Sequence, residues 1–267
     1  ELENKKKIGI IGETGSGKTT LLKKIFDYYN QKKVVLLCSI DQVVTANRKR
    51  VLKEAFEDIY GTDAVDYEKY LRLPPQNKML LIDDIHLIKP NRLAKFMEGV
   101  ESEFGYIIYT SDDCVELKIE ERIKSSVEKE QFTQYRLMKF YEDKRQELIA
   151  RVVDLKLHDQ LHEQDYADAI SASLKKQRRY LSLTPSNILQ YITYYIQNKA
   201  TGIQTDSNIF GKVFEASITT AIQRYIVPPL SVEKVYIVLD KIAYYAHENR
   251  RYPIPYCDIM HVIEQYN

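Results

Sequence analysis

The sequence predicts an α/β fold, in which a parallel five-stranded sheet is covered by helices and followed by an α-helical region. In the first half, short apolar runs alternate with amphipathic stretches, a pattern typical of successive β-α-β units. The first four of these runs are nearly continuous, as expected for strands that are buried on both faces. From about residue 139 these runs end, and apolar side chains recur at helical spacing, as in Ile188, Tyr191, Ile192 and Tyr195.

Each element follows from this alternation. The expected strands are Lys7–Ile11, Val34–Cys38, Met79–Ile82, Tyr106–Thr110 and roughly Phe132–Leu137. The expected helices of the first half are Lys18–Tyr29, Arg48–Tyr60, Asp66–Leu71 and Arg92–Glu101. Pro74, Pro75 and Pro90 mark places where helices stop or start.

Composition excludes several function classes. The chain has 267 residues, of which 44% are hydrophobic, with 39 Lys and Arg against 38 Asp and Glu. This balance argues against nucleic-acid binding driven by bulk charge, although nucleic-acid binding through a local basic patch stays compatible with it. The three cysteines, Cys38, Cys114 and Cys257, have no C-x-x-C spacing, which argues against a disulfide framework and a zinc cluster.

No apolar stretch approaches the roughly 20 residues needed to span a bilayer. We therefore expect a cytoplasmic protein without a membrane partner. The sequence begins at Glu1 rather than Met, which suggests a fragment of a longer polypeptide.

The strongest motif is Gly12-Glu13-Thr14-Gly15-Ser16-Gly17-Lys18-Thr19, a full match to the phosphate-binding pattern G-x-x-x-x-G-K-S/T. An apolar strand precedes it and a helix follows, so backbone N–H groups and the helix N-terminus can surround a phosphate. The predicted nucleotide-binding residues are Gly12, Glu13, Thr14, Gly15, Ser16, Gly17, Lys18, Thr19 and Thr20. Lys18 would bridge the β- and γ-phosphates, and the Thr19 hydroxyl would be a ligand of Mg²⁺.

A second nucleotide motif follows the third strand, where Met79–Ile82 runs directly into Asp83 and Asp84. Ligands of α/β proteins bind at the carboxyl ends of the strands. Asp83 would therefore hold the Mg²⁺ shell, and Asp84 would orient and deprotonate the attacking water. The alternative is that Asp84 only caps the following turn. His86 would either sense the γ-phosphate or a neighbouring subunit, or be structural.

The fourth strand runs into the polar sequence Thr110-Ser111-Asp112-Asp113. A polar side chain there can hydrogen-bond the attacking water or the γ-phosphate, which makes Thr110 and Ser111 candidate catalytic residues. A cap made by Ser111 or Asp112 explains the same residues equally well.

These motifs resemble the additional-strand class of P-loop NTPases, because the strand Val34–Cys38 lies between the phosphate loop and the Asp83-Asp84 strand. Motifs of the N-K-x-D and L-S-G-G-Q types, typical of GTPases and ABC transporters, are absent. A helical domain after five strands resembles AAA+ proteins and their STAND relatives, including NACHT and NB-ARC switches. The double acid Asp83-Asp84 resembles the STAND pattern, and no persuasive arginine finger follows the fourth strand, Arg122 being the nearest.

The second half extends the resemblance to bacterial STAND proteins. Leu183-Thr184-Pro185-Ser186 resembles their G-x-P element without its glycine, in which the proline contacts the adenine or ribose; Pro185 is equally well an ordinary first-turn proline. The helices Val232–His247 and Tyr256–Gln265 resemble the opening of a winged-helix domain. The domains expected are 1–138, the P-loop domain; 139–230, a helical lid-like domain; and 231–267, a truncated winged-helix-like segment.

The resemblance implies an ATP- and Mg²⁺-dependent switch that hydrolyses ATP slowly, self-associates when ATP is bound, and acts in bacterial defence through effector and sensor domains outside this sequence. The alternatives are a AAA+ motor acting on DNA or protein, with Arg122 or Arg178 acting between subunits, and a catalytically dead module that holds ADP. The run Lys175-Lys176-Gln177-Arg178-Arg179 would reach the nucleotide, bind nucleic acid or form a solvated face.

Overall fold

The computed structural model describes residues 6–38, 47–88, 90–112, 132–138, 140–157, 163–178, 182–200, 211–216, 218–219, 222, 231–250, 254 and 256–265. Two compact units divide the chain. Unit 1 comprises Glu1–Glu163 together with Leu183–Ile188, and unit 2 comprises Gln164–Ser182 together with Leu189–Asn267. The domain boundaries after residues 138 and 230 stay predictions.

Unit 1 contains a five-stranded parallel sheet in the order β2-β3-β4-β1-β5. The strands are β1 (Lys7–Gly12), β2 (Val34–Cys38), β3 (Lys78–Ile82), β4 (Tyr106–Asp112) and β5 (Thr133–Arg136). The predicted α/β fold class, a parallel five-stranded sheet followed by helices, is confirmed. The order places β1 between β4 and β5, so the loop that leaves the carboxyl end of β1 emerges beside the end of β4.

Helices and short 3₁₀ turns connect the strands. They are α1 (Lys18–Tyr29), α3 (Arg48–Tyr60), α4 (Ala64–Arg72), η2 (Pro75–Asn77), η3 (Ile85–Leu87) and α5 (Pro90–Glu103), and α7 (Glu142–Leu157) follows β5. Asn47 caps α3 by accepting the Lys49 N–H at 2.9 Å, and Asp63 caps α4 by accepting the Val65 N–H at 2.8 Å. Such caps satisfy backbone donors that a helix start would otherwise leave without a partner.

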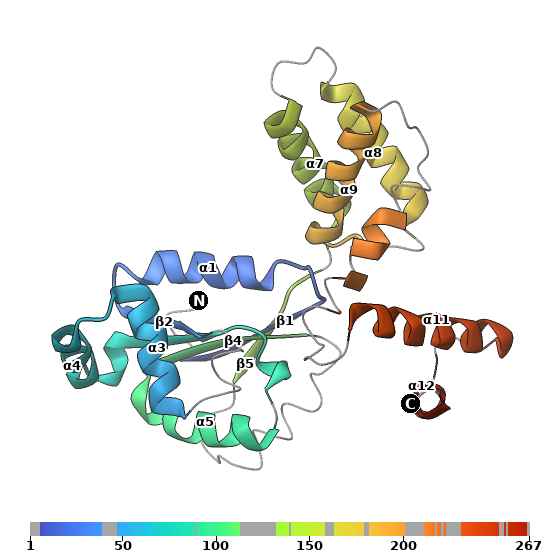
Figure 1. Ribbon diagram of the computed structural model, residues 1–267. Coiled ribbons are helices and arrows are strands. Elements are labelled where there is room, and N and C mark those ends of the chain that lie inside the picture. The colour runs from blue at the N-terminus through green and yellow to red at the C-terminus, as the bar shows by residue number, and fades with distance from the viewer. Residues whose placement is uncertain are drawn as a thin grey trace. The chain divides into compact units, whose positions relative to one another are not determined.

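The two faces of the sheet carry separate apolar clusters, because successive strand residues point to opposite faces. One face packs against α1 and includes Ile8, Ile10, Val35, Met79, Leu81 and Ile108 with Leu22 and Ile25. The other packs against α3 and α5 and includes Leu36, Leu80, Ile82, Ile107 and Tyr109 with Val51, Phe56, Phe96 and Val100. Figure 1 shows α1 on one side of the strands and α3 with α5 on the other.

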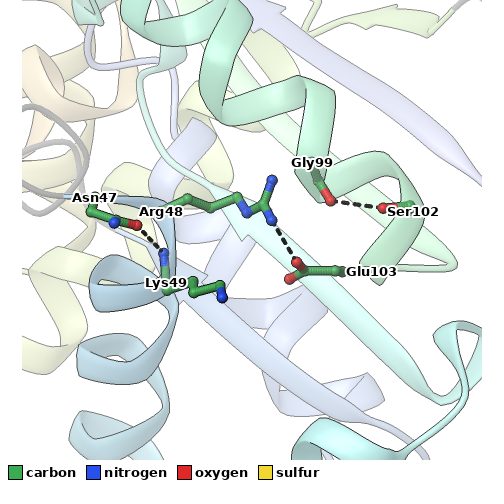
Figure 2. Close-up of polar contacts among 6 residues, drawn as sticks. All are labelled: Asn47, Arg48, Lys49, Gly99, Ser102 and Glu103. Atoms are coloured by element: carbon green, nitrogen blue, oxygen red, sulfur yellow. Dashed lines mark hydrogen bonds and ion pairs between the residues drawn. The ribbon is translucent and has the colours of Figure 1, made fainter.

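A charged contact joins the start of α3 to the end of α5 (Figure 2). Arg48 Nη2 lies 2.9 Å from Glu103 Oε1, one turn beyond Gly99. A Cβ placed on Gly99 would lie 0.9 Å from Arg48 Nη1, so the absence of a side chain there provides the room for the guanidinium group. The glycine therefore serves helix packing at this position.

Unit 2 is helical in its described residues. It holds most of α8 (Glu163–Gln177), the part of α9 (Pro185–Ala200) from Leu189 onward, α11 (Val232–Glu248) and α12 (Tyr256–Gln265). Between α8 and α9, the buried hydroxyls of Ser173 and Tyr191 are hydrogen-bonded at 2.5 Å. Ser231 caps α11 by accepting the Lys234 N–H at 3.3 Å. None of the described helices has the length and apolarity needed to cross a membrane.

Candidate functional site

The loop between β1 and α1 turns through two glycines. Gly15 and Gly17 have φ values of 79° and 99°, in the left-handed region that favours glycine. The Ser16 N–H donates to the Glu13 carbonyl at 3.1 Å, which closes a turn, and α1 begins at Lys18, directly after Gly17. The loop therefore leads straight into a helix N-terminus, where free N–H groups and the helix dipole favour an anion.

Lys18 is buried, and its ammonium group lies over the loop. Nζ donates to the Gly12 carbonyl at 2.7 Å and to the Glu13 carbonyl at 3.0 Å. A buried cation needs such partners, since burial away from water disfavours the charge. The contacts place a positive charge at the loop that the helix N-terminus already makes attractive to anions.

Asp83 joins three elements at the carboxyl edge of the sheet. Its Oδ2 accepts the Thr19 hydroxyl of α1 at 2.8 Å, and its Oδ1 accepts the Thr110 hydroxyl of β4 at 2.5 Å. Its backbone N–H donates to the Cys38 carbonyl of β2 at 3.2 Å. The structure thus brings together Thr19, Asp83 and Thr110, which the sequence predicted as site residues from three separate segments.

Asp84 follows in an unusual backbone conformation. Its φ of 50° and ψ of 48° are left-handed, which an Asp tolerates better than most residues, and its side chain is buried. Its N–H donates to Thr110 Oγ1 at 2.8 Å, and its carboxylate does not cap η3. The fold therefore holds this turn in a strained form, which is common at functional sites.

The two candidates at the end of β4 lie on opposite faces of the sheet. Thr110 shares the α1 face with Ile108 and Asp112, whereas Ser111 shares the opposite face with Tyr109, because side chains alternate along a strand. The Ser111 hydroxyl lies 3.5 Å from the Asp112 carbonyl oxygen. The geometry brings Thr110, and not Ser111, to Asp83.

A further pair of contacts links the loop to the segment after Asp84. The Thr14 hydroxyl donates to Asp112 Oδ2, and the Asp112 N–H donates to His86 Nδ1 at 3.3 Å. Burial lowers the pKa of His86 most, Lys18 lowers it further, and Asp112 and Asp83 oppose the shift. The sequence named Thr14 and His86, but the role of Asp112 as the connection between them was missed.

The sequence profile of the KAP family P-loop domain matches residues 1–216. The chain belongs to the KAP family of P-loop domains. The matched residues include the phosphate loop and the strand end at Asp83 and Asp84. No curated protein sequence gives a significant match to the chain.

Several solved structures resemble this KAP-family chain. The Aeropyrum pernix ORC2 protein in its ADP form is 13% identical over 99% of this chain and 80% of its own, with a TM-score of 0.52. Domain III of the Thermotoga maritima replication initiation protein DnaA is 19% identical, covering 78% of this chain and 83% of its own, with a TM-score of 0.49. Drosophila ORC bound to DNA is 13% identical, covering 97% and 80%, with a TM-score of 0.48. The likeness to the Aeropyrum protein supports the fold alone.

In the KAP-family domain of this chain, the start of α9 also reaches the phosphate loop. The Ser186 N–H donates to the Gly15 carbonyl at 3.2 Å, and a Cβ on Gly15 would lie 2.9 Å from Ser186 Cβ and 3.0 Å from Thr184 Oγ1. Pro185 is the first residue of α9, and Thr184 Oγ1 accepts the Asn187 N–H at 3.4 Å. The sequence named Pro185, and the contacts with the loop are made by its two neighbours. The Thr-Pro pair, a common start of a helix, was the available signal.

Other predicted residues fall elsewhere. Arg122, Arg179, Asp113 and Cys114 lie outside the described residues. Lys175, Lys176 and Arg178 are exposed at the end of α8, in unit 2. Cys38 is buried beside Asp83, and burial raises the pKa of its thiol to about 12, so it is not a reactive nucleophile.

The KAP-family site has hydrogen-bonding groups suited to a phosphate and oxygen ligands suited to Mg²⁺. Ser16 Oγ is buried without a hydrogen-bond partner among the described residues, which is unfavourable unless a ligand satisfies it. Thr19 and Asp83 present hard oxygen ligands 2.8 Å apart, and Mg²⁺ is typically held by one or two protein oxygens together with phosphates and water. Within the described ranges, no cluster of three or more His, Cys, Asp or Glu side chains forms a metal site.

Proposed function

We propose that this KAP-family domain binds Mg-ATP and acts as a slow switch of the STAND type. The observation that carries the proposal is the position of Asp83, whose carboxylate accepts hydroxyls from both α1 and β4 at the carboxyl edge of the sheet. Thr19 lies in α1, directly after the phosphate loop, and Thr110 lies near the carboxyl end of β4. The Asp83 carboxylate would therefore respond to a ligand bound at either place. The base proposed is adenine, as the resemblance to ATP-dependent switches implies; the structurally similar Aeropyrum pernix ORC2 protein is in its ADP form.

The proposed binding residues act through the groups described above. The loop N–H groups from Glu13 to Thr20 would surround the β-phosphate, and Lys18 would exchange its carbonyl partners for β- and γ-phosphate oxygens. Thr19 and Asp83 would hold Mg²⁺, which neutralises phosphate charge when bound. Pro185 would lie near the base or ribose through the contacts of its neighbours with the loop.

The proposed catalytic residues surround the same edge. Asp84 would orient the attacking water and accept its proton. Thr110 would fix the position of Asp84 through the Asp84 N–H, and Ser111 would support the end of β4. Since positioning carries much of phosphoryl-transfer catalysis, the proposed role of Asp84 would depend on the left-handed turn that fixes its backbone.

A switch needs a nucleotide that binds one conformation better than the other. A difference of roughly 1 to 3 kcal/mol is a usual scale for such coupling. The hydrogen bond from Ser186 to Gly15 gives the α9 segment a direct contact with the loop that would respond to the nucleotide. ATP binding would then favour self-association, and the effector and sensor parts of a defence system would lie outside this sequence.

Mass photometry with ADP and with a non-hydrolysable ATP analogue, combined with phosphate-release rates, tests the proposal. We expect assembly with the ATP analogue only, together with slow turnover. Asp84→Asn should retain ATP binding and lose phosphate release, and Asp66→Asn, an exposed Asp on α4, should match the wild type. Fast turnover stimulated by DNA would favour a motor instead, and an Asp84→Asn variant with unchanged turnover would remove the proposed role of Asp84.

A further inference from the structure

One nitrogen of the His86 imidazole has a hydrogen-bond partner, and the other has none among the described residues. His86 is the middle residue of η3, two residues after Asp84. Its Nδ1 accepts the Asp112 N–H at 3.3 Å. Its Nε2 is buried and has no hydrogen-bond partner among the described residues. Buried polar atoms without a hydrogen-bond partner are rare in folded proteins, so we expect Nε2 to bond to a ligand.

The hydrogen bond at Nδ1 fixes which nitrogen carries the proton. Since Nδ1 accepts, it is unprotonated, and the neutral ring then has its proton on Nε2. Burial holds the pKa of His86 below its ordinary value, which keeps the ring neutral at pH 7. Nε2 is therefore a buried N–H donor without an acceptor.

The groups around His86 belong to the phosphate side of the site. The electrostatic partners of the imidazole are Asp112, Lys18 and Asp83. Asp112 is also the acceptor of the Thr14 hydroxyl from the phosphate loop. The ring thus lies among residues of the loop, the β3 end and the β4 end, although it is not itself part of the loop.

We propose that His86 is the residue that distinguishes a nucleoside triphosphate from a diphosphate, because its Nε2–H donates to an oxygen of the terminal phosphate. This inference rests on the proposed function. The loop N–H groups would surround the β-phosphate, so a donor beside Asp83 and β4 is suited to a phosphate that extends beyond the loop. Binding of the triphosphate would give the buried Nε2–H an acceptor. Any movement of the ring would then reach the phosphate loop through the hydrogen bonds of Asp112 with His86 and Thr14.

Two substitutions separate the two nitrogens of the ring. His86→Asn places an amide oxygen near the Nδ1 position, so that the Asp112 N–H keeps an acceptor, but it removes the distal donor. His86→Gln places an amide nitrogen near the Nε2 position and keeps a donor there. Both variants are neutral, so their comparison does not change the charge of the site.

Titration calorimetry of the chain with Mg²⁺ and either ADP or a non-hydrolysable ATP analogue provides the test. His86→Asn should lower the affinity for the triphosphate analogue by about tenfold and leave the affinity for ADP within about twofold of the wild type. The reason is that the hydrogen bond to a charged oxygen is lost only with the triphosphate. His86→Gln should stay within about threefold of the wild type for both ligands.

An unchanged ratio of ADP to triphosphate affinity in His86→Asn would overturn the inference, as would equal weakening of both ligands, which indicates a role in folding only. If His86→Asn does not fold, the ¹⁵N shifts of the wild-type ring decide. Nε2 should shift with the triphosphate analogue and not with ADP, and no difference between the two ligands would overturn the inference. A wild-type chain that binds neither ligand would instead contradict the proposed function.

Discussion

The two units of the chain bury their apolar side chains in different ways. In unit 1, all five residues of β3 are buried, and clusters cover both faces of the sheet. In unit 2, α11 buries Ala246 alone, while Ile237 and Tyr244 are 57% and 63% exposed within the described chain. The candidate site lies entirely in the unit whose backbone is fixed by a buried sheet. The ends of β3 and β4 and the start of α1 bring Thr19, Asp83 and Thr110 into hydrogen-bond contact at one edge of the sheet. In the described helices of unit 2, the buried hydroxyl contact is the pair Ser173 and Tyr191.

The largest effect is expected where the phosphate loop depends on its backbone. Gly15→Ala should weaken nucleotide binding by on the order of 100-fold, because the residue has a φ of 79° and an added Cβ would lie 2.9 Å from Ser186 Cβ. Fluorescence titration with a labelled ADP measures this. Gly61→Ala is the matched control, since Gly61 has a φ of 92° but nothing within 4 Å of an added Cβ. It should lower stability and leave affinity intact; equal losses of affinity in both variants would assign the effect to folding.

The next effect concerns the sheet itself. Gly9→Ala in β1 should lower the free energy of unfolding by about 2 to 4 kcal/mol, because its Cβ would lie 2.6 Å from the buried Tyr109 ring. Gly99→Ala should cost only about 1 kcal/mol, since the flexible Arg48 side chain can move away and loses one ion pair. Urea denaturation compares the two. A Gly99→Ala variant that is as destabilised as Gly9→Ala would show that Arg48 cannot leave its position.

The sequence was most informative where pattern and motif coincide. The strand Val34–Cys38 and the helices Lys18–Tyr29 and Arg48–Tyr60 have the predicted bounds, because buried runs and caps are local signals. The fourth strand extends to Asp112 instead of ending at Thr110. Its last residues are polar, and they are in the sheet only because they pair with Ile11 and Gly12 of β1, a register that hydropathy does not reveal.

The candidate site shows the same division. Lys18, Thr19 and Asp83 follow from motif spacing, since the chemistry of phosphate and Mg²⁺ fixes those residue types. The contacts of Asp112 with Thr14, and of Ser186 with Gly15, join residues far apart in the chain, and nothing local specifies them. The alternation of side chains along β4 separates Thr110 from Ser111, but this argument requires the neighbouring strands to be known.

The hydrogen bond between Ser173 and Tyr191 tests how much a buried polar contact contributes to stability in unit 2. Tyr191→Phe should destabilise the chain by about 1 to 2 kcal/mol, because the buried Ser173 hydroxyl loses its partner at 2.5 Å. Adding Ser173→Ala should recover most of the loss, since both polar groups are then removed. Chemical denaturation of the single and double variants measures this. A double variant less stable than Tyr191→Phe would mean that Ser173 has another buried role.

The smallest effect is a pH dependence that originates in His86. The pKa of His86 is lowered in the folded state, mainly by burial and next by Lys18, from its ordinary value of 6.5. The unfolded chain therefore takes up the proton first as pH falls, so the stability contributed by the neutral ring is fully present above about pH 6.5. It declines from there down to the folded pKa, and below that value this group causes no further loss. The difference in unfolding free energy between the wild type and His86→Asn, measured from pH 7.5 to 5, should narrow or reverse as pH falls. A difference that grows in favour of the wild type at low pH would mean that the folded protein stabilises the charged imidazole, contrary to the burial observed.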